Sequence, residues 1–172
     1  MDSTIYYFAY GSNLHYQRIA ARVGGCTIHG RARVRGYQLA FHKVSQDGSG
    51  KCNAFRTDEI DHELWGVLYG LSVEQQKILD EIEGVGFGYE AEICSVEVAD
   101  AVFGGVFYVA QTEYVDHTAR PYSWYKDFVL HGARQHRLPE PHVEMIEAIE
   151  ALQDPDIDRH QANVAILTMS DR

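Results

Sequence analysis

Apolar residues recur along the chain in two patterns, and the first of them predicts strands. These segments are short and either wholly apolar or alternating with polar residues, as in strands that bury two faces or one. The segments expected to form strands are residues 5–9, 26–42, 63–71, 91–98 and 102–109. Gly30 and Gly36 predict bends or bulges. Imperfect alternation in residues 91–98 predicts a bulge there or burial on both faces.

The second pattern, unbroken stretches with apolar residues three and four positions apart, predicts helices. The expected helices cover residues 14–22, the segment between Ser72 and Gly84, and residues 123–137 and 142–152. Asn13 is expected to cap the first of them. Ser72 and Gln75 form a capping-box pattern at the start of the second, and Gly84 is a natural stop. The tail after Asp154 stays unassigned.

Length and composition bring these elements into one domain. The chain has 172 residues, of which 45% are apolar, so we expect a single domain over residues 1–172 with a substantial core. Strands and helices follow one another in irregular order, which favours an α+β fold over a regular alternation of the two. About six or seven strands are enough for a small barrel or curled sheet. The place of residues 152–172 is left open.

The charge and the cysteine content argue against several classes of function and site. The 25 acidic and 15 basic side chains give a net charge of −10, which makes nucleic acid an unfavourable partner. Arg31, Arg33 and Arg35 form a local basic cluster that is compatible with a small anion. The three cysteines include no CxxC pair and predict neither disulfides nor a zinc site. The first residues resemble neither a signal peptide nor a membrane span, so we expect a cytoplasmic protein without membrane association.

Several short motifs resemble known sites but lack the residues that the chemistry needs. Residues 48–51 lack the first glycine of a phosphate loop. Residues 154–158 begin like a calcium loop, yet the required glycine and glutamate are missing further on. His131 and His136 diverge around a helix because they are five positions apart. We therefore expect no metal site. Cys52 would need a histidine partner, which the sequence does not identify, to serve as a nucleophile.

A strand that runs through a tight turn into a helix is the first candidate site. The turn is formed by residues 10–13 (YGSN), and Gly11 lets another backbone or a ligand approach closely. Free N–H groups at the start of the following helix would favour an anion. The alternative is an ordinary capped turn with no function.

Three carboxylates at the end of the predicted second helix are the other candidate. Asp80, Glu81 and Glu83 occupy its last turn, where the negative end of the helix dipole disfavours them. Mutual repulsion and the dipole both favour a protonated carboxyl, and such a group suits proton transfer near neutrality. The alternative is a solvated acidic helix end on an acidic surface.

Three segments together resemble the γ-glutamylcyclotransferase-like family. They are YFAYGSNL at 7–14, WGVLYGL at 65–71 and LDEIEGV at 79–85. Residues 132–152 are similar to the C-terminal helices of the γ-glutamylcyclotransferases. The motifs have the family's order and span residues 5–152, whereas residues 42–60 and those after 152 match no pattern that we can name. The resemblance implies a small mixed β-barrel or curled sheet with flanking helices.

The resemblance also implies a site and a reaction. Tyr10, Gly11, Ser12 and Asn13 would form the substrate-binding loop, Glu83 the catalytic acid/base, and Tyr108 and Tyr125 part of the pocket wall. Tyr122 or Trp124 is an alternative to Tyr125, and with Tyr114 they would form an aromatic wall near the amine half of the substrate. The implied reaction needs no metal or cofactor. The α-amine of a γ-glutamyl compound, such as glutathione, attacks the γ-carbonyl and releases 5-oxoproline and an amine or amino acid.

The expected partner is therefore a small γ-glutamyl substrate, and two other functions stay open. A pathway-specific enzyme of the same fold would act on a γ-glutamylamine or a biosynthetic intermediate. A small-molecule-binding protein would keep the fold without the activity. The presence of both the 10–13 loop and Glu83 favours an enzyme, because neither is needed for stability. No feature of the sequence fixes the oligomeric state, and a homodimer is one assembly to be tested.

Overall fold

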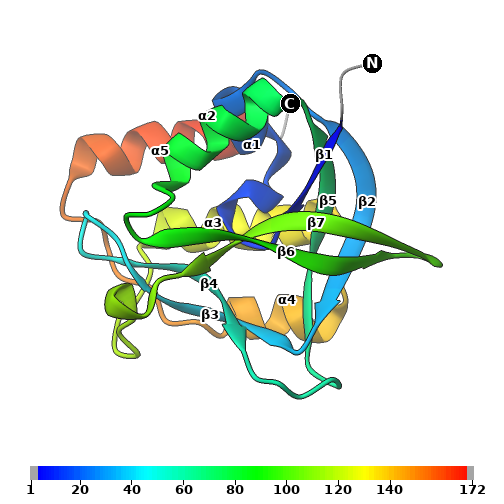
Figure 1. Ribbon diagram of the computed structural model, residues 1–172. Coiled ribbons are helices and arrows are strands. Elements are labelled where there is room, and N and C mark those ends of the chain that lie inside the picture. Colours follow the sequence, from blue (N-terminus) through cyan, green and yellow to red (C-terminus); the bar gives the residue numbers. More distant parts are fainter. Residues whose placement is uncertain (1–3, 170–172) are drawn as a thin grey trace.

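The computed structural model describes residues 4–169 and is built around a closed barrel (Figure 1). The barrel strands are β1 (Ile5–Ala9), β2 (Thr27–Arg35), β5 (Glu63–Leu71), β6 (Tyr89–Val98) and β7 (Ala101–Ala110). Their order is β1-β5-β2-β6-β7, and a parallel pairing of β7 with β1 closes the barrel. The other barrel pairs are antiparallel. The expected α+β fold with a small mixed barrel is confirmed.

The wholly apolar strand β1 lies in the core and delivers the chain to the candidate site. Phe8 and Ala9 are fully buried. The neighbouring strand β5 comes very close here, because a Cβ on Gly66 would lie 2.2 Å from the carbonyl oxygen of Ala9. Only glycine allows this approach. The residues that follow Ala9 therefore leave the barrel directly beside its core.

A second, two-stranded sheet lies next to the barrel. It consists of β3 (Tyr37–Val44) and β4 (Gly50–Arg56). The polar turn between them is held by Asp47, whose carboxylate accepts hydrogen bonds from the backbone and hydroxyl of Ser49 and from the ammonium of Lys51. This hairpin places one face of β4 against the loop that follows β1.

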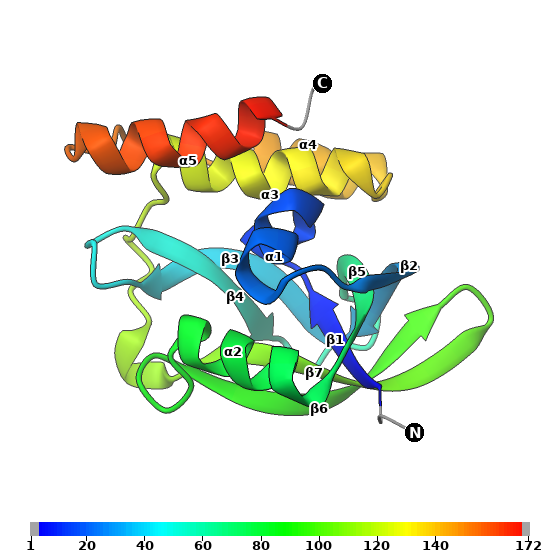
Figure 2. The same ribbon diagram turned by 90° about the horizontal axis from the view of Figure 1, so that it is seen from above.

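Helices surround the two sheets. They are α1 (Tyr16–Val23), α2 (Val73–Glu83), α3 (Ser123–Gln135), α4 (Glu140–Glu147) and α5 (Ile157–Met169), with short 3-10 helices at Ser12–Leu14 and Thr112–Tyr114. Figure 2 shows α3, α4 and α5 together in one layer, with α2 well away from them. No helix among residues 4–169 is long and apolar enough to cross a membrane.

The local signals around α2 are confirmed. The hydroxyl of Ser72 accepts from the backbone N–H of Gln75, whose side chain in turn accepts from the Ser72 N–H. Gly84 ends the helix in the left-handed conformation, with φ of 70°, which a residue without Cβ adopts at no cost. The cap at Ser72 and the stop at Gly84 fix where α2 begins and ends, and therefore the position of Glu83, its last residue.

Two expectations about the strands and the first helix are wrong. Asn13 does not cap α1, because a 3-10 turn intervenes and α1 begins at Tyr16 without a side-chain cap. The strand β6 has neither a bulge nor two buried faces: its pairing with β7 is continuous and residues 90–93 are exposed. The β6–β7 hairpin extends beyond the barrel at its turn (Figure 1), whereas residues 90–93 lie near the other end of β6. The irregular pairing lies instead in β2, at Gly30 as expected.

The last part of the described chain consists of two helices, α4 and α5, that differ from the sequence-based expectation. The helix expected over residues 142–152 is α4, and it starts and ends earlier, at Glu140 and Glu147. The unassigned tail forms α5, which packs on α3. It is anchored by the buried carboxylate of Asp154, which accepts from the indole of Trp124 and pairs with Arg159.

Candidate functional site

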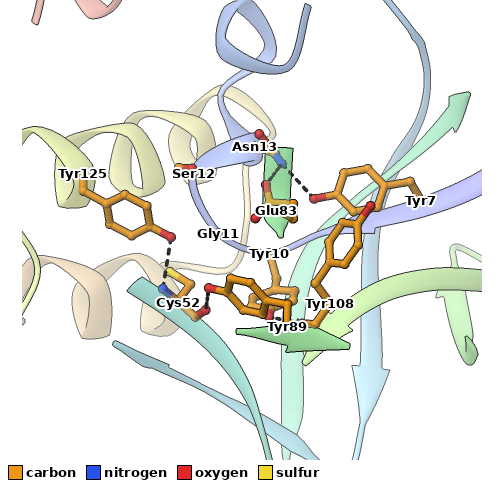
Figure 3. A pocket seen from close by; sticks show the side chains of 10 residues that line it. All are labelled: Tyr7, Tyr10, Gly11, Ser12, Asn13, Cys52, Glu83, Tyr89, Tyr108 and Tyr125. Carbon is orange, nitrogen blue, oxygen red and sulfur yellow. Dashed lines mark hydrogen bonds between the residues drawn. The ribbon is translucent and has the colours of Figure 1, made fainter. Parts of the chain in front are cut away.

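A small pocket opens where the loop after β1 meets α2, α3, β4 and the β6–β7 pair (Figure 3). Its empty volume is about 290 Å³, part of which is open to solvent. Its lining residues are Tyr7, Tyr10, Gly11, Ser12, Asn13, Cys52, Glu83, Tyr89, Tyr108 and Tyr125. The structure therefore brings together all seven residues that the sequence analysis named for the site.

The loop of residues 10–13 is held against both neighbouring walls. A Cβ on Gly11 would lie 3.0 Å from the Cβ of Cys52 and 3.4 Å from the hydroxyl of Tyr125, so glycine allows close packing here. The hydroxyl of Tyr10 donates to the carbonyl of Tyr108 across the pocket. The N–H groups of residues 11–13 precede the first hydrogen bond of the 3-10 turn, from Leu14 to Gly11. Such N–H groups have no partner within the turn.

Glu83 is fixed by two residues from the segment after β1. Its Oε1 accepts from the side-chain amide of Asn13 at 3.0 Å and lies 3.0 Å from a guanidinium nitrogen of Arg22. The same guanidinium nitrogen donates to the Asn13 oxygen, and the Asn13 amide also donates to the hydroxyl of Tyr7. Only 18% of the Glu83 side chain is exposed. The carboxylate is thus held in place, beside a positive charge, at the pocket wall (Figure 3).

The three acidic residues at the end of α2 do not act as one crowded cluster. Glu81 is exposed. The carboxylate of Asp80 accepts from the hydroxyl of Tyr108 at 2.7 Å and from the amide of Gln76 at 2.7 Å. Of the three, Glu83 alone lines the pocket. Asp80 instead fixes the orientation of a tyrosine that does.

Five buried tyrosines supply neutral hydroxyls to the pocket wall. Burial raises the pKa of Tyr7, Tyr10, Tyr89, Tyr108 and Tyr125 well above the ordinary value of a phenol. The hydroxyl of Tyr89 donates to the carbonyl of Cys52, and that of Tyr125 accepts from the Cys52 N–H. These hydroxyls stay protonated near neutrality and act as fixed dipoles.

Cys52 lines the pocket but is not suited to nucleophilic attack. Its side chain is buried, and burial raises the pKa of its thiol to about 12. Because the thiolate is the reactive form, such a thiol is inert near neutral pH. No group of three His, Cys, Asp or Glu side chains among residues 4–169 is arranged to hold a metal ion.

Behind the loop, Arg18 links Ser12 to the C-terminal helix. Its Nε donates to the hydroxyl oxygen of Ser12 at 3.1 Å, and its Nη1 donates to Asn163 of α5 at 3.0 Å. The guanidinium lies 4.3 Å from the ring centre of Phe128. Since the Ser12 oxygen accepts from Arg18, the Ser12 hydroxyl proton is free to be donated to a ligand.

Other residues considered in the sequence analysis lie elsewhere. Tyr114, Tyr122 and Trp124, expected as an aromatic wall near the amine half of the substrate, are not among the residues that line this pocket. The hydroxyl of Tyr122 donates to the backbone of Asp47, and the indole of Trp124 to Asp154. The basic cluster on β2 is largely neutralised, since Arg33 and Arg35 pair with Glu63 and Glu97. Arg31 donates to the backbone carbonyl of Arg137.

Comparisons with known proteins place this geometry in a family. A sequence profile of the AIG2-like family matches residues 63–146. The chain is 31% identical over 155 residues to the human protein named gamma-glutamylcyclotransferase, an alignment that covers 87% of this chain and 80% of the human one. The mouse protein of the same name is 30% identical, with 86% and 79% covered. The chain belongs to the γ-glutamylcyclotransferase family.

The fold supports the same assignment. A solved structure titled gamma-glutamyl cyclotransferase superposes with a TM-score of 0.82 and 25% identity, over 95% of this chain and 99% of that one. The residues matched by the AIG2-like profile include Glu83, Tyr108 and Tyr125 but not the loop of residues 10–13. The longer alignments extend over most of the chain.

Sequence analysis missed four residues of the site. Tyr7, Cys52 and Tyr89 line the pocket, and Arg22 pairs with Glu83. Tyr7 lies within the apolar run of β1 and gives no local sign of a different role. Arg22 pairs across 61 positions of the chain, which no local pattern encodes. None of the four was among the residues that the resemblance implied for the site, and only the fold brings them beside those residues.

Proposed function

We propose that the chain is a γ-glutamylcyclotransferase that converts γ-glutamyl amides into 5-oxoproline and a free amine or amino acid. The observation that carries this proposal is the position of Glu83. Its carboxylate lies at the pocket wall, held by Asn13 and Arg22, beside the loop of residues 10–13. A single fixed carboxylate is what the reaction needs, because the substrate provides its own nucleophile.

The reaction is an intramolecular displacement at the γ-carbonyl. The α-amino nitrogen forms a bond with the γ-carbon, the bond between that carbon and the leaving nitrogen breaks, and a five-membered lactam results. Two protons pass in total from the attacking nitrogen to the leaving nitrogen, and Glu83 carries them in turn. A well-oriented intramolecular attack is worth about 7–11 kcal/mol of the barrier. Holding the substrate folded is therefore the main task of the pocket.

The loop and the tyrosines orient the folded substrate. The N–H groups of residues 11–13 and the hydroxyl of Ser12 are the donors offered to the α-carboxylate or to the developing oxyanion. Arg18 turns the Ser12 proton toward the ligand and adds a positive charge behind it. Tyr108, fixed by Asp80, and Tyr125, fixed by Cys52, complete the wall with neutral hydroxyls. No metal or cofactor takes part in the proposed step.

Release of 5-oxoproline tests the proposal. The purified protein is incubated with γ-glutamyl amino acids, glutathione and γ-glutamyl amines, and the lactam is quantified. The variant Glu83→Gln keeps the shape of the side chain but cannot accept a proton, so we expect turnover to fall by at least about 10²–10⁴-fold.

Glu81→Gln is the matched control, because Glu81 is exposed on the same helix. It should retain wild-type turnover. Substantial activity in a folded Glu83→Gln protein would falsify the role of Glu83. Absence of the lactam from every substrate with folded wild-type protein would instead favour a specialised biosynthetic substrate or a binding role.

A further inference from the structure

Lys43, on β3, is a buried cation that pairs with no carboxylate in the described part of the chain. Only 7% of the residue is exposed, and its ammonium makes no ion pair or hydrogen bond with any residue between 4 and 169. The nitrogen lies 4.7 Å from the ring centre of Tyr89, which lines the pocket, and 5.9 Å from that of Tyr114. Burying an ammonium costs free energy that two aromatic rings offset only in part.

Lys43 lies next to the segment that follows Glu83. A Cβ on Gly88 would come within 2.9 Å of the Lys43 nitrogen, so the ammonium rests directly against that glycine. Burial lowers the pKa of Lys43 from its ordinary value, and the negative charge of Glu83 opposes this lowering. The ammonium therefore lies against the segment that leads away from the proposed acid/base.

The other cations around the pocket are already engaged within the described part of the chain. Arg22 pairs with Glu83, and Lys51 pairs with Asp47. Arg18 donates to Ser12 and Asn163. Lys43 thus differs from these neighbours, since its ammonium faces the rings of Tyr89 and Tyr114 and pairs with no carboxylate of the described residues.

We propose that Lys43 is a specificity-determining residue that binds a carboxylate on the amine half of the substrate. This inference rests on the proposed function and deepens it. In the proposed function, the donors of the loop of residues 10–13 are offered to the γ-glutamyl half of the substrate, so a second anion needs a second cation. When the amine half is an amino acid, its carboxylate is one carbon away from the nitrogen that Glu83 protonates. The flexible stem of a lysine lets the ammonium follow that group.

A pair of substrates that differ in one charge tests this assignment. γ-Glutamylalanine carries the carboxylate, and γ-glutamylalaninamide has a neutral group of the same shape in its place. We expect kcat/KM of the wild-type protein to be about 10- to 100-fold higher for the acid, as for a hydrogen bond to a charged group. Lys43→Met, which keeps the apolar stem, should remove most of this preference by slowing the acid only.

Lys77→Met is the matched control, because Lys77 is exposed on α2 and its loss changes the net charge equally. It should leave the ratio of the two substrates unchanged. The assignment is overturned if the wild-type protein turns over both compounds equally, a comparison that needs no variant to fold. It is also overturned if Lys43→Met, or Lys43→Gln in its place, slows both substrates to the same extent. Lactam from neither compound overturns the proposed function and this assignment with it.

Discussion

Asn13 and Glu83 lie 70 positions apart in the chain and share a hydrogen bond of 3.0 Å. The amide that donates to Glu83 also donates to Tyr7, while its oxygen accepts from Arg22. One side chain therefore sets the position of the carboxylate relative to β1 and α1 at the same time. Through Asn13, the loop proposed to bind substrate and the proposed acid/base are held in one hydrogen-bonded unit.

Asn13→Ala tests this connection. It leaves the ion pair of Glu83 with Arg22 but removes the amide that fixes the carboxylate against the loop. A misplacement of about 1 Å can cost about 10²-fold in rate, so we expect kcat to fall by about 10- to 100-fold with a smaller change in KM. Steady-state kinetics measure both constants, and a thermal melt checks that the protein is folded. Unchanged kcat in the folded variant would contradict the positioning role.

Gly11→Ala tests the packing of the loop. The added methyl group would meet the Cβ of Cys52 at 3.0 Å and the hydroxyl of Tyr125 at 3.4 Å. Overpacking of this kind costs about 1–3 kcal/mol, and the displaced loop should lower turnover. In the double variant Gly11→Ala, Cys52→Gly the clash with Cys52 is absent, so activity should recover in part. Equal activity of the single variant and the wild type would show that the loop shifts without consequence.

Asn163→Ala tests the connection of α5 to the site. The variant removes the oxygen that accepts from Arg18, whose other bond orients Ser12. We expect KM to rise by about two- to fivefold, below the full value of a charged hydrogen bond, because water can replace the lost acceptor. Gln161→Ala, an exposed position on the same helix, is the control. A change in kcat with KM unaltered would argue against this route.

His142 makes the stability of the protein depend on pH. Burial lowers the pKa of His142 to about 4, and its buried Nε2 has no hydrogen-bond partner among residues 4–169. Between this value and the ordinary one near 6.5, the unfolded chain binds the extra proton and the folded chain does not. Stability is therefore lost as pH falls through this window, by up to about 3 kcal/mol.

Urea denaturation of wild type and His142→Leu between pH 7 and 4.5 measures this effect. The variant has no titrating ring, so its stability should decline less over the same range. Parallel declines of the two proteins would show that other groups cause the pH dependence.

The sequence predicts those parts of the fold that depend on neighbouring residues. The apolar run of β1, the reciprocal Ser72–Gln75 cap and the left-handed Gly84 are local, and each is found as expected. Asn13 shows the limit of such reasoning. Its residue type is a good helix cap, but a partner far along the chain takes its amide.

The C-terminal helix was not predictable for a related reason. Its apolar residues gather toward its end, over residues 162–169, and its beginning is fixed by individual polar contacts with distant residues. Asp154 accepts a hydrogen bond from Trp124, and Asn163 accepts one from Arg18. No periodicity encodes such contacts, which become visible only when the layers are assembled.

The buried tyrosines of the pocket determine how much mobile water surrounds a bound ligand on that side. Neutral hydroxyls, each held by a backbone or side-chain partner, stand where mobile water would otherwise solvate the substrate. Such a wall does not reorganise when charge moves during a reaction. In the proposed reaction, the polarity that a substrate meets on this side of the pocket is therefore set by the fold rather than by mobile water.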